Sequence, residues 1–126
     1  MGHRAVALLL LEAGAEVSSS DNAGRTPLAY AASQGHEAVV VLLLAHGALV
    51  SSKTTNGSTP LHAAALRGHR AVALLLLEAG AEVSATDNTE ATPLHYAAAW
   101  EQSACVLLLV QHGAMQASQF GQRIPS

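Results

Sequence analysis

The chain has 126 residues, 50% of them hydrophobic, so it is long enough and apolar enough to form one folded domain with a core. Six Lys and Arg against nine Asp and Glu give a net charge of −3, which argues against a nucleic-acid partner. The longest uninterrupted apolar run, residues 38–45, is far shorter than the roughly 20 residues that cross a bilayer, so we expect no membrane partner.

The chain opens with a segment whose sequence recurs later in the chain. Residues 2–18 read GHRAVALLLLEAGAEVS, and the same letters return at residues 68–84. A looser version, GHEAVVVLLLAHGALVS, occupies residues 35–51, which places it 33 residues from each copy. The tripeptide Thr-Pro-Leu keeps this spacing and begins at positions 26, 59 and 92. A period of 33 residues predicts stacked units, each of which needs its neighbours to bury its apolar face.

Residues 21–53 form one such unit. The opening Asp-Asn-Ala-Gly predicts a tight turn, because Asn and Gly accept positive φ and Asp can bond its own backbone. Thr26 precedes Pro27, and a hydroxyl followed by a residue without an N–H is typical of a helix start. We expect this first helix to run from Pro27 to about Gln34 and to end at Gly35 in a left-handed conformation.

The second helix of the unit is predicted from about Glu37 to Ala45. Its sequence is apolar on every side, so it must be covered by its own partner helix and by neighbouring units. A helix this short is marginal in water, and packing must supply most of its stability. We therefore expect a polar substitution at Leu43 or Leu76 to unfold more than one unit. The glycines expected to close the second helices of successive units are Gly14, Gly47, Gly80 and Gly113.

Residues 57–69 read Gly-Ser-Thr-Pro-Leu-His-Ala-Ala-Ala-Leu-Arg-Gly-His, and a leucine-rich run ending in Gly-Ala follows. This pattern closely resembles the ankyrin repeat, whose period is 33 and whose core phrase is Thr-Pro-Leu-His-x-Ala. The resemblance covers nearly the whole chain and implies an all-α solenoid of stacked antiparallel helix pairs with β-hairpin-like loops. It implies a single domain, residues 1–126, divided into a partial repeat (1–20), three full repeats (21–53, 54–86 and 87–119) and the truncated start of another (120–126).

The resemblance also implies a function. In this family the first helices and the loops line a concave face that binds other proteins, the second helices form the convex back, and no catalysis occurs. We therefore expect a protein–protein interaction module that needs no cofactor. The expected contact residues are those that vary between units in the loops and at the ends of the first helices: Arg25, Ser33, Gln34, Asn56, Ser58, Leu66, Arg67, Asn88, Thr89, Ala99 and Trp100.

Trp100 and Arg67 are the candidate anchors, because Trp and Arg are enriched among the residues that dominate binding energy. A structural interpretation stays open for both. Trp100 could cover the altered turn beside Glu101, and Arg67 could simply be a solvated side chain.

The sequence departs from the family pattern at three places. Ala29 stands where the family has His, so its unit lacks one buried polar link. Glu90 replaces the loop glycine, and Glu101-Gln102 replaces the Gly-His pair between the helices. Because positive φ costs a non-glycine residue about 1–2 kcal/mol, we expect the helix at Trp100 to run on by one or two residues.

Every histidine has a place in the repeat. Two follow Thr-Pro-Leu, three follow the glycine between the helices, and two precede the closing glycine: His62 and His95; His3, His36 and His69; His46 and His112. Equivalent positions in successive units lie far apart compared with the ~2 Å bonds that a metal requires, so we expect no metal site. The rings are expected to bond the Thr hydroxyl and the backbone of adjoining loops.

Cys105 aligns with valines of the other units, which predicts a buried and unreactive thiol. No spacing pairs a nucleophile with a base, so we expect no enzyme activity. A single cysteine also excludes an internal disulfide, and no secretory signal is visible at the start. We expect an intracellular, cytoplasmic location.

Both ends are predicted to be incomplete. Residues 5–11 read like an interior helix, although stacked arrays normally end in units with a polar outer face. Either the chain is cut from a longer array, or it forms a homodimer or end-to-end assembly through this helix. The identity of residues 2–18 and 68–84 favours an alternative function class: an engineered, recombined or duplicated scaffold without a physiological ligand. Silent differences between the two gene copies would indicate natural duplication.

Overall fold

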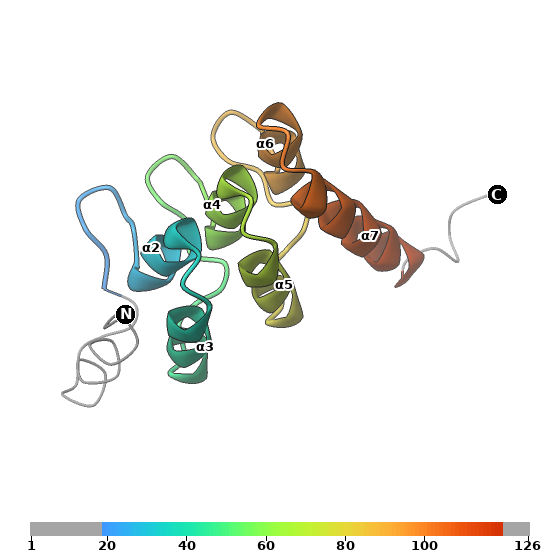
Figure 1. The fold of residues 1–126 in the computed structure, drawn as a ribbon. Helices are drawn as coiled ribbons and strands as arrows, with labels where there is room; N and C mark the ends of the chain where they lie inside the picture. The colour runs from blue at the N-terminus through green and yellow to red at the C-terminus, as the bar shows by residue number, and fades with distance from the viewer. Residues whose placement is uncertain (1–18, 120–126) are drawn as a thin grey trace.

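The computed structural model describes residues 19–119, where the chain forms three helix pairs and no strand (Figure 1). The pairs are α2 (Pro27–Gln34) with α3 (Glu37–Ala45), α4 (Pro60–Arg67) with α5 (Arg70–Glu78), and α6 (Pro93–Ala99) with α7 (Ser103–Gln119). The predicted all-α fold is confirmed, and so are the predicted limits of the first helix pair. The helix expected at residues 5–11, the segment 120–126 and nearly all of the partial repeat 1–20 lie outside the described residues.

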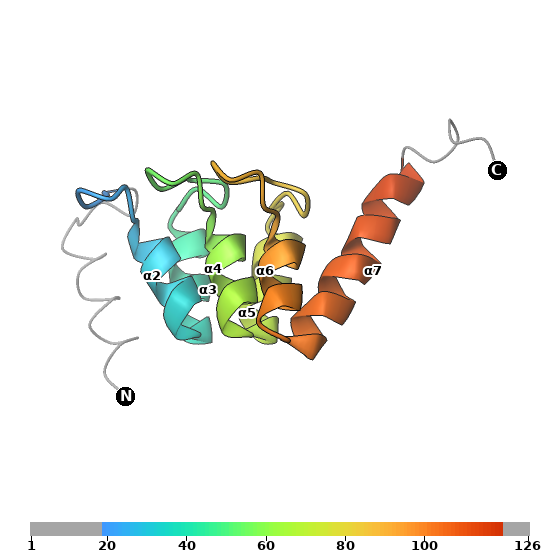
Figure 2. The same ribbon diagram turned by 90° about the horizontal axis from the view of Figure 1, so that it is seen from above.

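The helices form two rows. Helices α2, α4 and α6 pack side by side in the first row, and α3, α5 and α7 form the second (Figure 1). The loops that precede α2, α4 and α6 lie together along one edge of the stack (Figure 2). Within residues 19–119, no helix combines the length and the apolar character needed to cross a membrane.

The first-row helices begin at a shared Thr-Pro signal. Thr26, Thr59 and Thr92 have extended backbones, and each side-chain oxygen accepts a hydrogen bond from the backbone N–H three residues on. The following proline fills the first helical position, where an N–H would have no partner in the helix. Gly35 and Gly68, at φ 74° and 77°, end α2 and α4 in the left-handed conformation.

Two of the three helix starts carry a second capping bond. The rings of His62 and His95 accept hydrogen bonds from the backbone N–H groups of Thr59 and Thr92, which completes a capping box. At the same position of the first unit, Ala29 provides no side-chain acceptor, so only the threonine cap is present. The predicted loss of a polar link in this unit is confirmed.

The core is aliphatic and runs along the stack. Leu28 and Leu61 are fully buried between the rows, and Leu43 and Leu76 are buried on the second-row helices. Small alanines on the first-row helices let their backbones approach closely: Ala31, Ala32, Ala64, Ala65 and Ala97. Helix α3 is covered by its partner α2 and by α5 of the next unit, as predicted, and the Val41 side chain remains 49% exposed.

The third unit keeps its turns despite its two glutamates. Glu90 and Glu101 adopt φ of 65° and 58°, the same left-handed conformation as the glycines that they replace. Helix α6 therefore ends at Ala99, and the prediction that it runs on past Trp100 is wrong. The conformational cost of about 1–2 kcal/mol per residue is accepted because the surrounding turn fixes the backbone.

The space around the turn also differs between units. A Cβ atom added to Gly57 would lie 2.9 Å from the backbone nitrogen of Asn88, and one added to Gly24 would lie 3.1 Å from that of Thr55. Glycine is therefore required where another loop presses on the turn. The loop that contains Glu90 is the last of the three equivalent loops, so no equivalent loop among residues 19–119 presses on its Cβ.

Gly113 does not close the last second-row helix, contrary to its predicted role. Helix α7 continues through Gly113 to Gln119, whereas Gly47 and Gly80 adopt left-handed φ of 90° and 102° just after α3 and α5. The residues that follow explain the difference. Val50 and Val83 lie three positions after the closing glycines and pack on the core, and Gln116 takes their place after Gly113. A helical glycine costs only about 1 kcal/mol, which the better helix formers beyond it offset.

Truncation of a core leucine should destabilise the whole stack. We expect Leu76→Ala to lower the free energy of unfolding by about 2–5 kcal/mol, since Leu76 is fully buried and its removal leaves a cavity. Leu107→Ala is the matched control, because 63% of the Leu107 side chain is exposed. Urea unfolding measures both. Equal losses for the two variants would contradict the burial.

Restoring the missing histidine should stabilise the first unit. In Ala29→His the ring can accept from the Thr26 N–H and donate to the carbonyl of Ser58, the equivalents of the bonds that His62 makes. We expect a gain of about 1 kcal/mol in the free energy of unfolding. Ala38→His, which places the same side chain at an exposed position on α3, should give no gain. An unchanged or lower stability for Ala29→His would refute this account of the cap.

Candidate protein-binding face

The three loops form one continuous strip of backbone hydrogen bonds. Each loop is closed by a bond between its first and fifth residues, as in Thr54 N–H to the Ser58 carbonyl at 2.9 Å. Adjacent loops are joined by Thr55 N–H to the Ala23 carbonyl and by Asn88 N–H to the Asn56 carbonyl, both at 2.9 Å. The loops are therefore fixed relative to one another and can present side chains at set positions.

Long polar side chains tie each unit to its neighbour. His62 Nε2 donates to the Ala91 carbonyl at 2.9 Å, and His69 Nε2 donates to the Ser33 carbonyl at 3.0 Å. Gln102 uses its amide in the same way on the Leu66 carbonyl at 2.9 Å. These contacts confirm the predicted hydrogen-bonding role for His62 and His69. No group of three or more His, Cys, Asp or Glu in the described part of the chain is placed to hold a metal ion.

His62 is held as a neutral ring. Its Nδ1 accepts from the Thr59 N–H at 3.1 Å, so the proton must sit on Nε2, which donates to the neighbouring loop. Burial lowers the pKa of His62, because a charged ring would lose the stabilisation that solvent gives it. Its ring also meets the ring of Tyr96 edge-on, with centroids 5.8 Å apart.

Cys105 is fully buried in α7, as predicted. Burial raises the pKa of its thiol, which keeps the sulfur protonated and a poor nucleophile near neutral pH. The side chain therefore contributes packing rather than chemistry.

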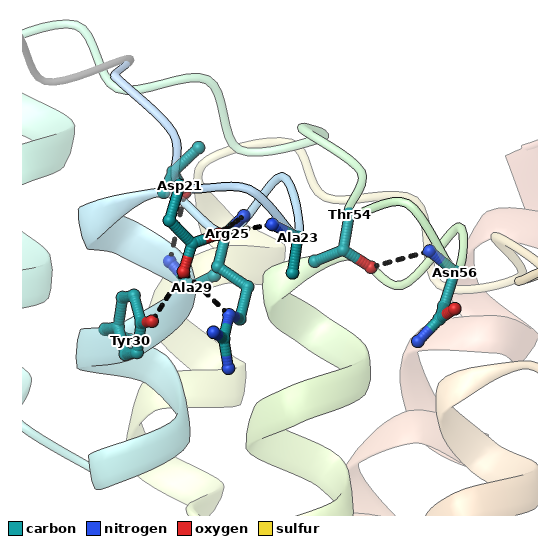
Figure 3. A network of polar contacts seen from close by, with 8 residues as sticks. Asp21, Ala23, Arg25, Ala29, Tyr30, Thr54 and Asn56 are labelled. Atoms are coloured by element: carbon teal, nitrogen blue, oxygen red, sulfur yellow. Dashed lines mark hydrogen bonds and ion pairs between the residues drawn. The ribbon is translucent and has the colours of Figure 1, made fainter.

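The first and third loops each contain an aspartate bonded to a tyrosine of the following helix. Tyr30 Oη donates to Asp21 at 2.7 Å (Figure 3), and Tyr96 Oη donates to Asp87 in the third unit. Asp21 also accepts from Arg25 Nε at 2.9 Å, and the Arg25 guanidinium lies 5.1 Å from the Tyr30 ring centre. The tyrosine hydroxyl, followed by backbone N–H groups, lowers the pKa of Asp21 to about 2. The Tyr96 hydroxyl, followed by the Thr89 hydroxyl, likewise lowers the pKa of Asp87.

The middle unit has no such pair. Thr54 and Ala63 occupy the positions of the aspartate and the tyrosine. A hollow of ≈ 420 Å³ lies here, between the first two loops and helices α2 and α4. Its lining residues are Ala23, Arg25, Ala29, Tyr30, Ser33, Gln34, Thr54, Asn56, Ser58, Thr59, Ala63 and Arg67.

The structure brings six of the eleven predicted contact residues together around this hollow. These are Arg25, Ser33, Gln34, Asn56, Ser58 and Arg67. The other five lie elsewhere: Leu66, Asn88, Thr89, Ala99 and Trp100. Asn88 and Thr89 are occupied with loop structure, because Asn88 Nδ2 donates to the Thr55 carbonyl and Thr89 donates to Asp87. Trp100 is 64% exposed and lies directly after α6.

Four important residues of this lining were not predicted to be part of a site: Ala29, Tyr30, Thr54 and Ala63. The signal was present in the alignment of the units. One position reads Ala, His, His, and the next reads Tyr, Ala, Tyr in successive units. A small residue at both of two facing positions predicts a hollow, but only a structure shows that the two positions face each other.

The tyrosine-bonded aspartates should make stability fall in acid. The unfolded carboxyls titrate near 3.8, whereas the folded pKa of Asp21 is about 2, so between these values the unfolded chain binds more protons. The stabilisation that this carboxylate contributes is therefore fully present above about pH 5, and it is lost as the pH falls toward about 2. Asp21→Asn should flatten this decline, whereas Glu78→Gln, at an exposed site, should not. Thermal melting between pH 2 and pH 6 measures the slopes, and equal slopes for Asp21→Asn and the unmodified chain would contradict the assignment.

Comparison with known proteins agrees with this architecture. A search of curated proteins found no match. A family model described as ankyrin repeats (3 copies) matches residues 1–87 and again residues 52–119. Ankyrin repeats are generally protein-interaction modules that lack catalytic activity. The matched regions, the 33-residue period and the stacked helix pairs together show that this chain belongs to the ankyrin-repeat family.

Proposed function

We propose that the chain is a noncatalytic module that binds a protein partner on the face formed by its loops and first-row helices. One observation carries the proposal. Residues that recur from unit to unit, such as Leu28 and Leu61, are buried, whereas those that change, such as Arg25, Asn56 and Arg67, are exposed on this face. Side chains freed from packing on a rigid scaffold are suited to contacting another molecule.

Trp100 and Arg67 are proposed as separate anchors on this face. Both stand at the ends of first-row helices, Arg67 as the last residue of α4 and Trp100 directly after α6. Both are exposed, and a Trp ring or an Arg guanidinium becomes an energetic centre when a partner excludes water from it. The loop strip beside them is already ordered by hydrogen bonds, which limits the entropy lost on binding.

An intracellular, cytoplasmic setting is part of the proposal. Its support is the single thiol of Cys105, which lies in the core of α7 and needs no oxidising environment.

Loss of either anchor should weaken binding and spare the fold. We expect Trp100→Ala and Arg67→Ala each to lower the affinity for the partner by about tenfold or more. Each should change the free energy of unfolding by about 0.5 kcal/mol at most. A partner captured from a cell lysate by the unmodified chain, then purified, is titrated against each variant by calorimetry. Leu107→Ala, an equally exposed apolar residue on the second row, is the control and should bind normally. Retained affinity in both anchor variants, or a parallel loss of folding, would overturn the proposal.

A further inference from the structure

The two intervals between first-row helices are filled differently. Between α4 and α6, the rings of His62 and Tyr96 meet edge-on, and His62 is 2% exposed. The equivalent positions between α2 and α4, each 33 residues earlier, are Ala29 and Ala63. Two rings present in one interval are thus replaced by two methyl groups in the other. The hollow of ≈ 420 Å³ lies where these rings are absent, and both alanines line it.

The hollow has the size and the surface of a side-chain pocket. Its volume falls within the range of about 300–1,000 Å³ typical of ligand sites. Ala29 and Ala63 provide apolar surface, Tyr30 provides an aromatic one, and Thr54, Asn56 and the other hydroxyl and amide groups add polar contacts. An aromatic side chain matches this lining, since it buries a large apolar area and makes the edge-on contacts that His62 and Tyr96 make in the next interval.

The charged side chains that line the hollow are both positive. Its only charged lining residues within the described part of the chain are Arg25 and Arg67, although the whole chain carries a net charge of −3. Arg25 is held by Asp21 at 2.9 Å and lies against the Tyr30 ring. Arg67, exposed at the end of α4, has no ion-pair partner among residues 19–119. A carboxylate that reaches the rim would pair with the Arg67 guanidinium through two parallel hydrogen bonds.

We propose that this hollow binds an aromatic side chain of an extended, acidic peptide segment, with a neighbouring carboxylate of that segment on Arg67. The inference rests on the proposed protein-binding function and assigns the partner's chemistry. It also assigns a cause: the middle unit has no Asp–Tyr pair and the first unit has no histidine, and the small residues at these positions leave the site open.

The test fills the hollow with the chain's own residues. Ala29→His and Ala63→Tyr each copy the side chain found at the equivalent position of a neighbouring unit, so each should fold and occupy the space. Ala38→His and Ala71→Tyr place the same side chains at exposed second-row positions as controls. Circular dichroism and thermal melting verify folding of all four. Because the two filling variants act from opposite helices, a failure of one to fold leaves the other as the test.

The probes are three fluorescein-labelled peptides, Gly-Ser-Glu-Tyr-Glu-Ser-Gly, its Lys-Tyr-Lys analogue and its Glu-Ala-Glu analogue, titrated by fluorescence anisotropy with the full chain. We expect the Glu-Tyr-Glu peptide to bind at least about tenfold more tightly than the two analogues. Ala29→His, Ala63→Tyr and Arg67→Ala should each weaken it by about tenfold or more, and the control variants should leave its Kd within about twofold.

The outcomes separate this inference from the proposed function. Unchanged binding of the Glu-Tyr-Glu peptide to a folded filling variant, or no preference over the two analogues, overturns the pocket. Trp100→Ala should leave this short peptide unaffected while it weakens the protein captured from the lysate. If the pocket fails and the Trp100→Ala effect on the captured protein persists, the protein-binding function stands without this site.

Discussion

Each unit of this stack depends on its neighbour for the partners of its own polar groups. His62, His69 and Gln102 all reach across a unit boundary to a backbone carbonyl. Within the described residues, no buried side-chain nitrogen or oxygen lacks a hydrogen-bond partner. Because an unsatisfied buried polar group costs about 1–3 kcal/mol, removal of one unit would penalise the next as well as expose its leucines. Polar bonds and apolar packing therefore favour the same spacing, which makes the stack cooperative.

The helix limits were readable from the sequence because they are set locally. A threonine hydroxyl, a proline at the first helical position and a glycine at the end act within one or two turns, so α2 and α3 fall where these residues place them. At Gly113, the local sequence signals do not give the end of the helix. The same glycine ends a helix or lies inside one according to whether the residues after it, such as Val50 or Val83, are drawn onto the core. That choice depends on the neighbouring unit.

The exposed residues of the loops and first-row helices were predictable from the sequence, but the hollow between them was not. Variation between units correctly placed Arg25, Asn56 and Arg67 on the surface of the loops and first-row helices. It also selected Asn88 and Thr89, whose side chains are already engaged in hydrogen bonds between and within the loops. The hollow depends on Ala29 and Ala63 facing each other from different helices. The absence of a large side chain at each of two positions leaves no local pattern in the sequence. The hollow is therefore recognised only when the structure shows that the two positions face each other.

Glu90 makes the loop of the third unit differ from the loops of the first two units. At the first two loops, a Cβ in this position would come within 2.9–3.1 Å of a backbone nitrogen of the next loop, and that close approach sets how tightly successive loops nest. A second ankyrin surface brought against the loop of the third unit meets the Glu90 side chain instead of a glycine. It cannot settle at the separation found inside the chain. The loop of the third unit is thus chemically unlike the two before it, and a loop stacked on it at the internal separation would press on the Glu90 Cβ.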